Sequence, residues 1–127
     1  MVKLIQQTEE FTLVGAVSPS HQGKLLNQVL PIADLPSLEI NGSLEEALQK
    51  HSADVIVDFT VPEAVQKHLE LALDYRVRPV VGTSGIRKET IEDLKEAYAR
   101  QKLGAVIAPN FAIGAVLMMK FASIAAK

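Results

Sequence analysis

Five short apolar runs are distributed along the chain, and longer segments with helical spacing of apolar residues lie between or after them. The clearest run, 54–59, is nearly continuous in apolar β-branched residues. Such runs occur in parallel sheets whose two faces are both covered, so this run predicts a buried strand. The remaining runs predict strands at 12–17, 38–40, 79–82 and 105–108.

Two capping-box patterns predict the starts of helices. Ser43 is followed three positions later by Glu46, and this helix is expected to continue to about residue 50. Thr60 is followed by Glu63 in the same way, with a proline in the first turn, and this helix is expected to end near residue 75.

Two further helices are expected nearer the end of the chain. The first covers about 88–101 and ends before Gly104, a residue suited to a C-terminal cap. Its buried residues are expected to be Ile91, Leu94 and Tyr98. The second covers 111–127 and is so apolar that we expect it to be buried, with Met118 and Met119 in the core. The uncharged stretch 103–119 is interrupted by a proline and a glycine, and it is shorter than the roughly 20 apolar residues of a membrane-spanning helix.

Strands that alternate with helices at this spacing form a βαβ series. Right-handed crossovers then place helices on both faces of a mostly parallel sheet, so the expected fold is α/β and doubly wound, with 1–127 as a single domain. The segment 18–37 carries three prolines and is expected to be a long irregular connection. Ligands of such folds bind at the carboxyl ends of strands, which directs attention to the loops after residues 17, 59, 82 and 108.

Composition narrows the function. The chain has 127 residues, 48% of them hydrophobic, and 13 Lys and Arg against 15 Asp and Glu. The hydrophobic content argues against a disordered chain, and the near balance of charges argues against a nucleic-acid binder and a membrane-surface binder. The chain has no cysteine, and His21, His51 and His68 lack metal-ligand spacing, so no metal site is expected. The first residues lack the basic-then-apolar pattern of a secretion signal. We therefore expect a cytoplasmic protein, or one of a plastid or other organelle stroma if the source is photosynthetic.

Three loops carry candidate chemistry, each with an ordinary structural alternative. Phe59 and Thr60 could form one wall of a cofactor site beside a helix N-terminus, or simply a core residue and an N-cap. The segment 82–85, Gly-Thr-Ser-Gly, could let a ligand approach the backbone closely and offer it two hydroxyls, or it could be only a tight turn. It does not match the G-x-S-x-G pattern of a nucleophile elbow. The segment 109–111, Pro-Asn-Phe, offers an amide and an aromatic ring, or is an ordinary helix start.

Taken in order, three segments resemble the nucleotide-binding half of dihydrodipicolinate reductase, also called 4-hydroxy-tetrahydrodipicolinate reductase. They are Val-Asp-Phe-Thr at 57–60, Val-Gly-Thr-Ser-Gly at 81–85 and Ala-Pro-Asn-Phe-Ala-Ile-Gly at 108–114. The resemblance covers essentially the whole chain. It implies a Rossmann-like domain of an oxidoreductase that reduces a cyclic precursor of diaminopimelate and lysine, a small-molecule substrate, with NADH or NADPH.

The resemblance also implies roles for single residues. Ser84 stands where the family has a second threonine, and it keeps the hydroxyl that contacts substrate. Gly82 and Thr83 fall at the nicotinamide end of the cofactor site. The implied cofactor-binding residues are Phe59, Thr60, Gly82, Thr83, Ser84, Ala108, Pro109, Asn110 and Phe111.

The chain also departs from the family pattern. Residues 1–4 are expected to lie in the helix that follows the family's first strand and its G-x-x-G-x-M-G phosphate loop, so both are missing here. Ser18-Pro19-Ser20 stands where an acidic residue would hold the adenine ribose, and Lys24 could attract a 2′-phosphate. The substrate domain with its H-H-x-x-K-x-D-A-P-S-G-T segment is absent, so no catalytic residue is expected in this chain.

These departures predict an incomplete sheet. In the strand order 3-2-1-4-5-6 the missing strand lies between 12–17 and 54–59, which leaves unpaired edges that allow self-association. The isolated chain is expected to lack catalysis and to bind cofactor weakly. Two alternatives stay open: a non-catalytic nucleotide-binding or protein-interaction module derived from this fold, and a different NAD(P)-dependent dehydrogenase.

Overall fold

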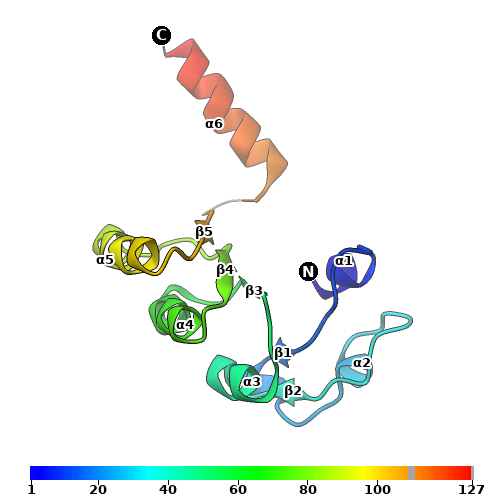
Figure 1. Ribbon diagram of the computed structural model, residues 1–127. Helices are drawn as coiled ribbons and strands as arrows, with labels where there is room; N and C mark the ends of the chain where they lie inside the picture. Colours follow the sequence, from blue (N-terminus) through cyan, green and yellow to red (C-terminus); the bar gives the residue numbers. More distant parts are fainter. Residues whose placement is uncertain (109–110, 127) are drawn as a thin grey trace. The chain divides into compact units, whose positions relative to one another are not determined.

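The computed structural model describes residues 1–108 and 111–126 (Figure 1). The chain divides into two compact units, 1–53 and 54–127. Each unit has its own sheet and its own buried cluster, and each is described by itself.

The first unit is built on a two-stranded parallel sheet in which Ala16 lies opposite Ile40. Just before the second strand, Glu39 forms an antiparallel bridge with Leu25. Leu26, Leu35 and Ile40 form the buried cluster of this unit. Its elements are α1 (Val2–Gln6), β1 (Ala16–Val17), η1 (Pro19–His21), α2 (Leu26–Val29), β2 (Ile40–Asn41) and α3 (Leu44–Lys50).

The structure confirms the helix that the first capping box predicts. The Glu46 amide donates to Ser43 Oγ at 3.2 Å, and Glu46 Oε2 accepts from the Gly42 amide at 3.0 Å. Glu46 also pairs with Lys50 at 2.8 Å. Because the Ser43 side chain satisfies an amide in the first turn and the Glu46 side chain satisfies the Gly42 amide just before the helix, α3 begins at the predicted place.

Three expectations for this unit are corrected. The strand expected at 12–17 is only two residues long, and the one expected at 38–40 is shifted to Ile40–Asn41, because a ladder extends only where both strands run side by side. The segment 18–37 is not wholly irregular, since it contains η1 and α2. Pro19 begins η1, as suits its fixed φ, and Leu26 anchors α2 in the core.

The second unit confirms the βαβ series. Its three parallel strands have the order β3-β4-β5, with Val57 opposite Val80 and Val81 opposite Ile107. Helices α4 and α5 lie on the same side of these strands (Figure 1). The elements are β3 (Val55–Asp58), α4 (Pro62–Asp74), β4 (Arg78–Val81), α5 (Lys88–Arg100), β5 (Val106–Ile107) and α6 (Ile113–Ala125).

The interruption of the sheet is also confirmed. Within the described residues β1 pairs only with β2, and β3 pairs only with β4. The two strand edges that a central strand would fill therefore belong to separate sheets.

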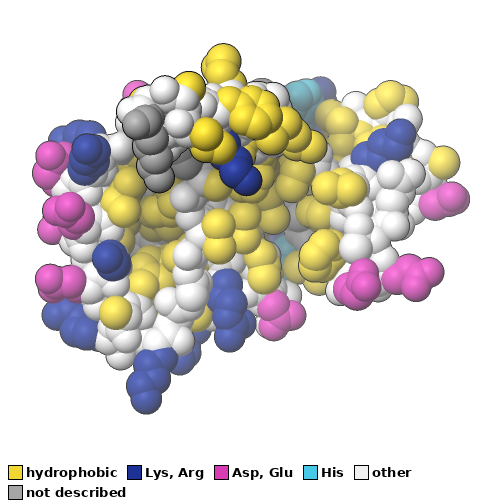
Figure 2. All heavy atoms as spheres, turned by 90° about the horizontal axis from the view of Figure 1, so that it is seen from above, with side chains coloured by type: hydrophobic (Ala, Val, Ile, Leu, Met, Phe, Trp, Pro, Cys, Tyr) yellow, Lys and Arg dark blue, Asp and Glu magenta, His cyan; other side chains and the backbone are white. Residues whose placement is uncertain are grey.

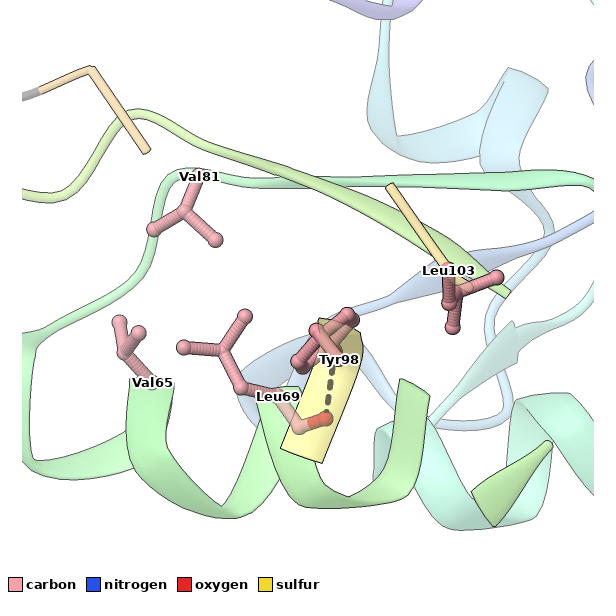
Figure 3. Close-up of a cluster of buried hydrophobic side chains, with 5 residues drawn as sticks. All are labelled: Val65, Leu69, Val81, Tyr98 and Leu103. Atoms are coloured by element: carbon pink, nitrogen blue, oxygen red, sulfur yellow. Dashed lines mark hydrogen bonds between the residues drawn. The ribbon is translucent and has the colours of Figure 1, made fainter. Parts of the chain in front are cut away.

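The core of the second unit joins both helices to β4. Val65 and Leu69 of α4 pack with Val81 of β4, Tyr98 of α5 and Leu103 (Figure 3). The Tyr98 hydroxyl donates to the Leu69 carbonyl at 2.7 Å, so the buried phenol has a partner (Figure 3). Burial raises the pKa of Tyr98 to about 12. Of the three residues expected to be buried on α5, Tyr98 is buried and the other two are half-buried.

Helices α4 and α5 end in the same way, and neither end uses a glycine. Arg76 and Lys102 adopt left-handed backbone conformations, with φ of 58° and 55°. The amides of Val77 and Leu103 donate back to the carbonyls of Ala72 and Tyr98 at 2.8 and 3.1 Å. These are Schellman motifs. The prediction that Gly104 caps α5 is therefore wrong, because the αL position falls two residues earlier.

Several residues expected to be buried are exposed. Val55 and Val57 of β3 are 48% and 38% exposed, because α4 and α5 lie on one side of the sheet only. No residue of α6 is buried, and Met118 and Met119 are 68% and 55% exposed, so the expected buried helix is wrong. Many side chains on the face seen in Figure 2 are hydrophobic (yellow). Hydropathy predicts that a surface will be covered but does not specify which element covers it. None of the helices within the described residues is long and apolar enough to cross a membrane.

Candidate functional site

The carboxyl ends of the three parallel strands meet at one edge of the second unit. The Gly82 amide donates to the Asp58 carbonyl at 2.8 Å, and the Ala108 amide donates to the Val81 carbonyl at 2.9 Å. These two bonds extend the ladders one step past the ends of the strands. They bring the starts of the three candidate loops together, as strands of a parallel sheet require.

Two exposed aromatic rings and one glycine lie at this edge. The Phe59 ring lies over Gly82 so closely that a Cβ at Gly82 would collide with it. The ring centroids of Phe59 and Phe111 are 5.6 Å apart and the planes are tilted by 55°. Both rings remain about half exposed, at 48% and 51%. The aromatic surface at the ends of β3 and β5 is thus continuous and open to a ligand.

Below the rings, a buried carboxylate organises the loop after β3. Asp58 is 5% exposed, and its Oδ1 accepts from the Thr60 amide at 2.9 Å and from the Thr60 hydroxyl at 2.6 Å. Its Oδ2 lies 2.7 Å from Nδ1 of His68, which reaches it from the second turn of α4. Burial by itself raises the pKa of Asp58, but the hydrogen bonds from His68 and Thr60 outweigh burial and hold this pKa below its ordinary value.

This arrangement overturns the second capping box. The N-cap of α4 is Val61, whose side chain has no polar group, and Thr60 lies one residue before it. The Thr60 hydroxyl donates to the charged Asp58 oxygen instead of accepting from a helix amide. The start of α4 is therefore fixed by a carboxylate in the preceding strand, with proline in the first turn as predicted.

The loop after β4 divides its hydroxyls between the interior and the surface. Thr83 is buried, and its Oγ donates to the Thr60 carbonyl at 3.3 Å. Ser84 is exposed. Gly85 has φ of 83°, a conformation that favours glycine. Of the two predicted hydroxyls, Thr83 thus links two loops of the site, and Ser84 is accessible from solvent.

The third loop is described only in part. Ala108 is half-buried beside the end of β4, and Phe111 contacts Phe59. Pro109 and Asn110 lie outside the described residues. The structure therefore brings together seven of the nine residues proposed from the sequence.

Sequence reasoning missed two polar groupings. Asp58 and His68 are ten positions apart, and the signal was an aspartate that ends a strand followed by a histidine in the next helix. In the first unit, Ser18 Oγ and Ser20 Oγ each lie 3.1 Å from His21 Nδ1, just after β1. Within the described residues, His, Asp and Glu side chains form no group of three or more that could hold a metal ion.

Comparison with known proteins places this geometry in a family. Residues 1–111 match the family model "Dihydrodipicolinate reductase, N-terminus". The chain belongs to this family. It is 45% identical to the 4-hydroxy-tetrahydrodipicolinate reductase of Oceanobacillus iheyensis over 99% of its length, and 46% identical to that of Halalkalibacterium halodurans, also over 99%. These alignments cover 48% and 47% of the two reductases, so the chain spans about half the length of the curated relatives it matches.

A solved structure of the family has the same fold. Dipicolinate-bound dihydrodipicolinate reductase from Paenisporosarcina sp. TG-14 superposes with a TM-score of 0.75 at 38% identity, over 96% of this chain and 46% of that one. The expected α/β, Rossmann-like fold is confirmed by this likeness and by the parallel sheets.

Proposed function

We propose that the chain forms the nucleotide-binding part of an NAD(P)H-dependent 4-hydroxy-tetrahydrodipicolinate reductase, an oxidoreductase of diaminopimelate and lysine biosynthesis that acts in the cytoplasm. The observation that carries the proposal is the convergence of Phe59, Gly82 and Phe111 on one sheet edge. The chain's membership of the reductase family supports it. In this proposal residues 1–127 are a single, incomplete dinucleotide-binding domain.

The residues at this edge fit a nicotinamide ring. The half-exposed rings of Phe59 and Phe111 offer apolar faces, and the missing Cβ of Gly82 lets the Phe59 ring lie close against the backbone. A bound nicotinamide dinucleotide would supply the hydride for the reduction. Ser84 would present its exposed hydroxyl to the substrate, and this chain would contribute no catalytic residue. The proposed cofactor contacts are Phe59, Thr60, Gly82, Thr83, Ser84, Ala108, Pro109, Asn110 and Phe111.

Either nicotinamide dinucleotide fits the first unit. The turn after β1 carries Ser18, Ser20 and His21 in place of an acidic residue, so a 2′-phosphate meets no like charge there. Lys24, which could attract a 2′-phosphate, lies three residues after His21. The hydroxyls can equally donate to a ribose 2′-hydroxyl, so both NADPH and NADH are proposed cofactors.

The test starts from the protein as its source organism makes it. We expect an intact mass well above the 13.8 kDa of this chain. That protein should oxidise NADPH or NADH when supplied with 4-hydroxy-tetrahydrodipicolinate, and an inactive protein would contradict the proposal. The isolated 127-residue chain should bind either dinucleotide weakly, and micromolar affinity would show that this part of the proposal is wrong.

A substitution tests the site itself. Phe59→Ala should raise the KM for the dinucleotide roughly three- to ten-fold, the equivalent of about 0.5–1.5 kcal/mol of aromatic stacking. Phe11→Ala is the matched control, since Phe11 is also exposed but lies in the first unit, outside the proposed site. Equal effects of the two substitutions would argue against a nicotinamide ring at Phe59.

One observation favours a second candidate function. The β3 edge and the exposed Val55 and Val57 offer a surface on which a partner's strand could pair. In this alternative the chain is a non-catalytic nucleotide-binding or protein-interaction module derived from the same fold. Light scattering distinguishes it, because a chain that folds cooperatively and stays monomeric at all concentrations would exclude strand pairing between copies.

A further inference from the structure

The Asp58 carboxylate connects a strand, a turn and a helix next to Phe59 of the proposed nicotinamide site. We infer that Asp58 and His68 are positioning residues that hold the turn 59–61 in the conformation that places the Phe59 ring over Gly82. The inference deepens the proposed function, because it assigns residues that act on the site without forming its exposed surface.

The geometry shows how the turn is held. Phe59 lies between Asp58, which accepts, and Thr60, which donates twice to Asp58 Oδ1. The backbone on both sides of Phe59 is therefore fixed by one carboxylate, and so is the direction in which its side chain leaves the chain. The Thr60 carbonyl then accepts from Thr83 at 3.3 Å, which ties this turn to the loop after β4.

His68 completes the arrangement from the helix side. Its side chain is 20% exposed, and its Nδ1 lies 2.7 Å from Asp58 Oδ2, so both carboxylate oxygens are engaged. A buried carboxylate that loses such a partner moves toward water or rearranges its remaining hydrogen bonds. Since Val61 offers no polar cap, either change would release the Thr60 backbone and with it Phe59.

Asp58 and His68 act through other residues. Both oxygens of Asp58 are occupied and only 5% of the residue is exposed, so this carboxylate is not available to a ligand at the aromatic surface. A fully satisfied buried network of this kind specifies one local geometry. If Asp58 and His68 only stabilised the fold, the Phe59 ring would stay over Gly82 in any variant of this pair that still folds. The position of the ring in a folded variant therefore distinguishes the two roles.

The readout is the ring-current shift of the Gly82 α-protons by NMR in the 127-residue chain. His68→Leu, which removes the donor, should reduce this upfield shift by at least half. His68→Asn should retain most of it, because the asparagine amide nitrogen occupies the same place in the side chain as Nδ1. Val65→Ala is the control, since it removes buried volume from the same helix and should lower the unfolding midpoint without changing the shift.

The inference fails if the Gly82 shift is unchanged in a folded His68→Leu chain, or if His68→Asn loses as much of it as His68→Leu. If His68→Leu does not fold, Thr60→Val replaces it in the test, because this substitution removes only the hydrogen bond from the Thr60 hydroxyl to Asp58. A reduced upfield shift of the Gly82 α-protons would support the positioning role. An unchanged shift would overturn the inference. The experiment contains no nucleotide, so its result does not depend on whether the chain binds a cofactor. Failure of this inference and failure of the proposed function can therefore be distinguished.

Discussion

The Thr60 hydroxyl shows how a single interaction can decide between two local structures. As an N-cap it would stabilise α4 by about 1 kcal/mol. As a donor to the ionised Asp58 it makes a charge-assisted hydrogen bond of about 1.5–3 kcal/mol, at a distance of 2.6 Å. The Thr60 hydroxyl therefore bonds to Asp58 and does not cap α4. The sequence shows both partners, but their relative burial decides the outcome, and burial is a property of the fold.

Asp58→Asn should make stability less dependent on pH. The folded-state pKa of Asp58 lies below its ordinary value of 3.8, so the carboxylate stabilises the fold fully at higher pH and progressively less as pH falls through the folded-state pKa. At pH 7 the variant should lose about 2 kcal/mol of unfolding free energy. Denaturant titrations of both proteins at pH 7 and at pH 3 should show this difference shrinking in acid.

Asp54→Asn is the control for that experiment, since Asp54 is exposed and the same charge is removed. It should change the unfolding free energy by less than about 0.5 kcal/mol. A loss for Asp58→Asn that is equally large at both pH values would show that the charge of Asp58 is not what stabilises the turn.

Gly82→Ala should displace the Phe59 ring rather than unfold the protein. The new Cβ would occupy the position of the ring, but Phe59 is half exposed and can turn toward solvent. The free energy of unfolding should fall by about 1 kcal/mol, mainly because the Phe59 ring loses its contact with Phe111. Thermal unfolding and the NMR shifts of the two rings measure it. Gly104→Ala is the control, because a Cβ there meets no atom within 4 Å; equal effects at both positions would contradict a close contact at Gly82.

At the scale of elements, the positions of helices and strands were more predictable than the interactions that cap the helices. The Ser43 capping box and the strands near 55, 79 and 106 could be located because their signals are local. The ends of α4 and α5 were also expected within one residue of Asp74 and Arg100, but their Schellman motifs were not, because Arg76 and Lys102 carry no glycine-like signal. Their αL conformation follows from Val77 and Leu103 turning back into the core, which is a tertiary effect.

Lys102→Gly should therefore stabilise the second unit. A side chain in the αL region costs about 1 kcal/mol, which glycine avoids, while the Schellman hydrogen bonds involve only backbone atoms. The unfolding midpoint in denaturant should rise accordingly. Lys95→Gly, at an exposed position inside α5, should instead lower stability by about 1 kcal/mol. A loss of stability in Lys102→Gly would show that the lysine side chain makes a compensating contact.

At the scale of the whole molecule, strand order could be derived and exposure could not. The absence of a ladder between β1 and β3 follows from counting strands against a common topology. The exposure of β3 and α6 does not follow, because an apolar pattern contains no information on whether its covering element is present. The candidate site could be anticipated for the same reason as the strand order, since parallel strands align their carboxyl ends.

Exposed apolar residues beside an unpaired edge should make the isolated chain associate. Val57→Lys places a charge on β3, the kind of residue that discourages edge pairing, and should raise the concentration for half-association several-fold. Sedimentation over a range of concentrations measures this. Gln49→Lys adds the same charge at an exposed position of α3 and should have little effect. A parent chain that is monomeric throughout would rule out association through this surface.

The pair of rings at 5.6 Å also has a practical consequence, because the chain contains no tryptophan. Phe59→Trp would introduce the sole indole fluorophore at the edge where the strands end. Its emission would then report solvent access and ligand arrival at that edge alone, without background from elsewhere in the polypeptide.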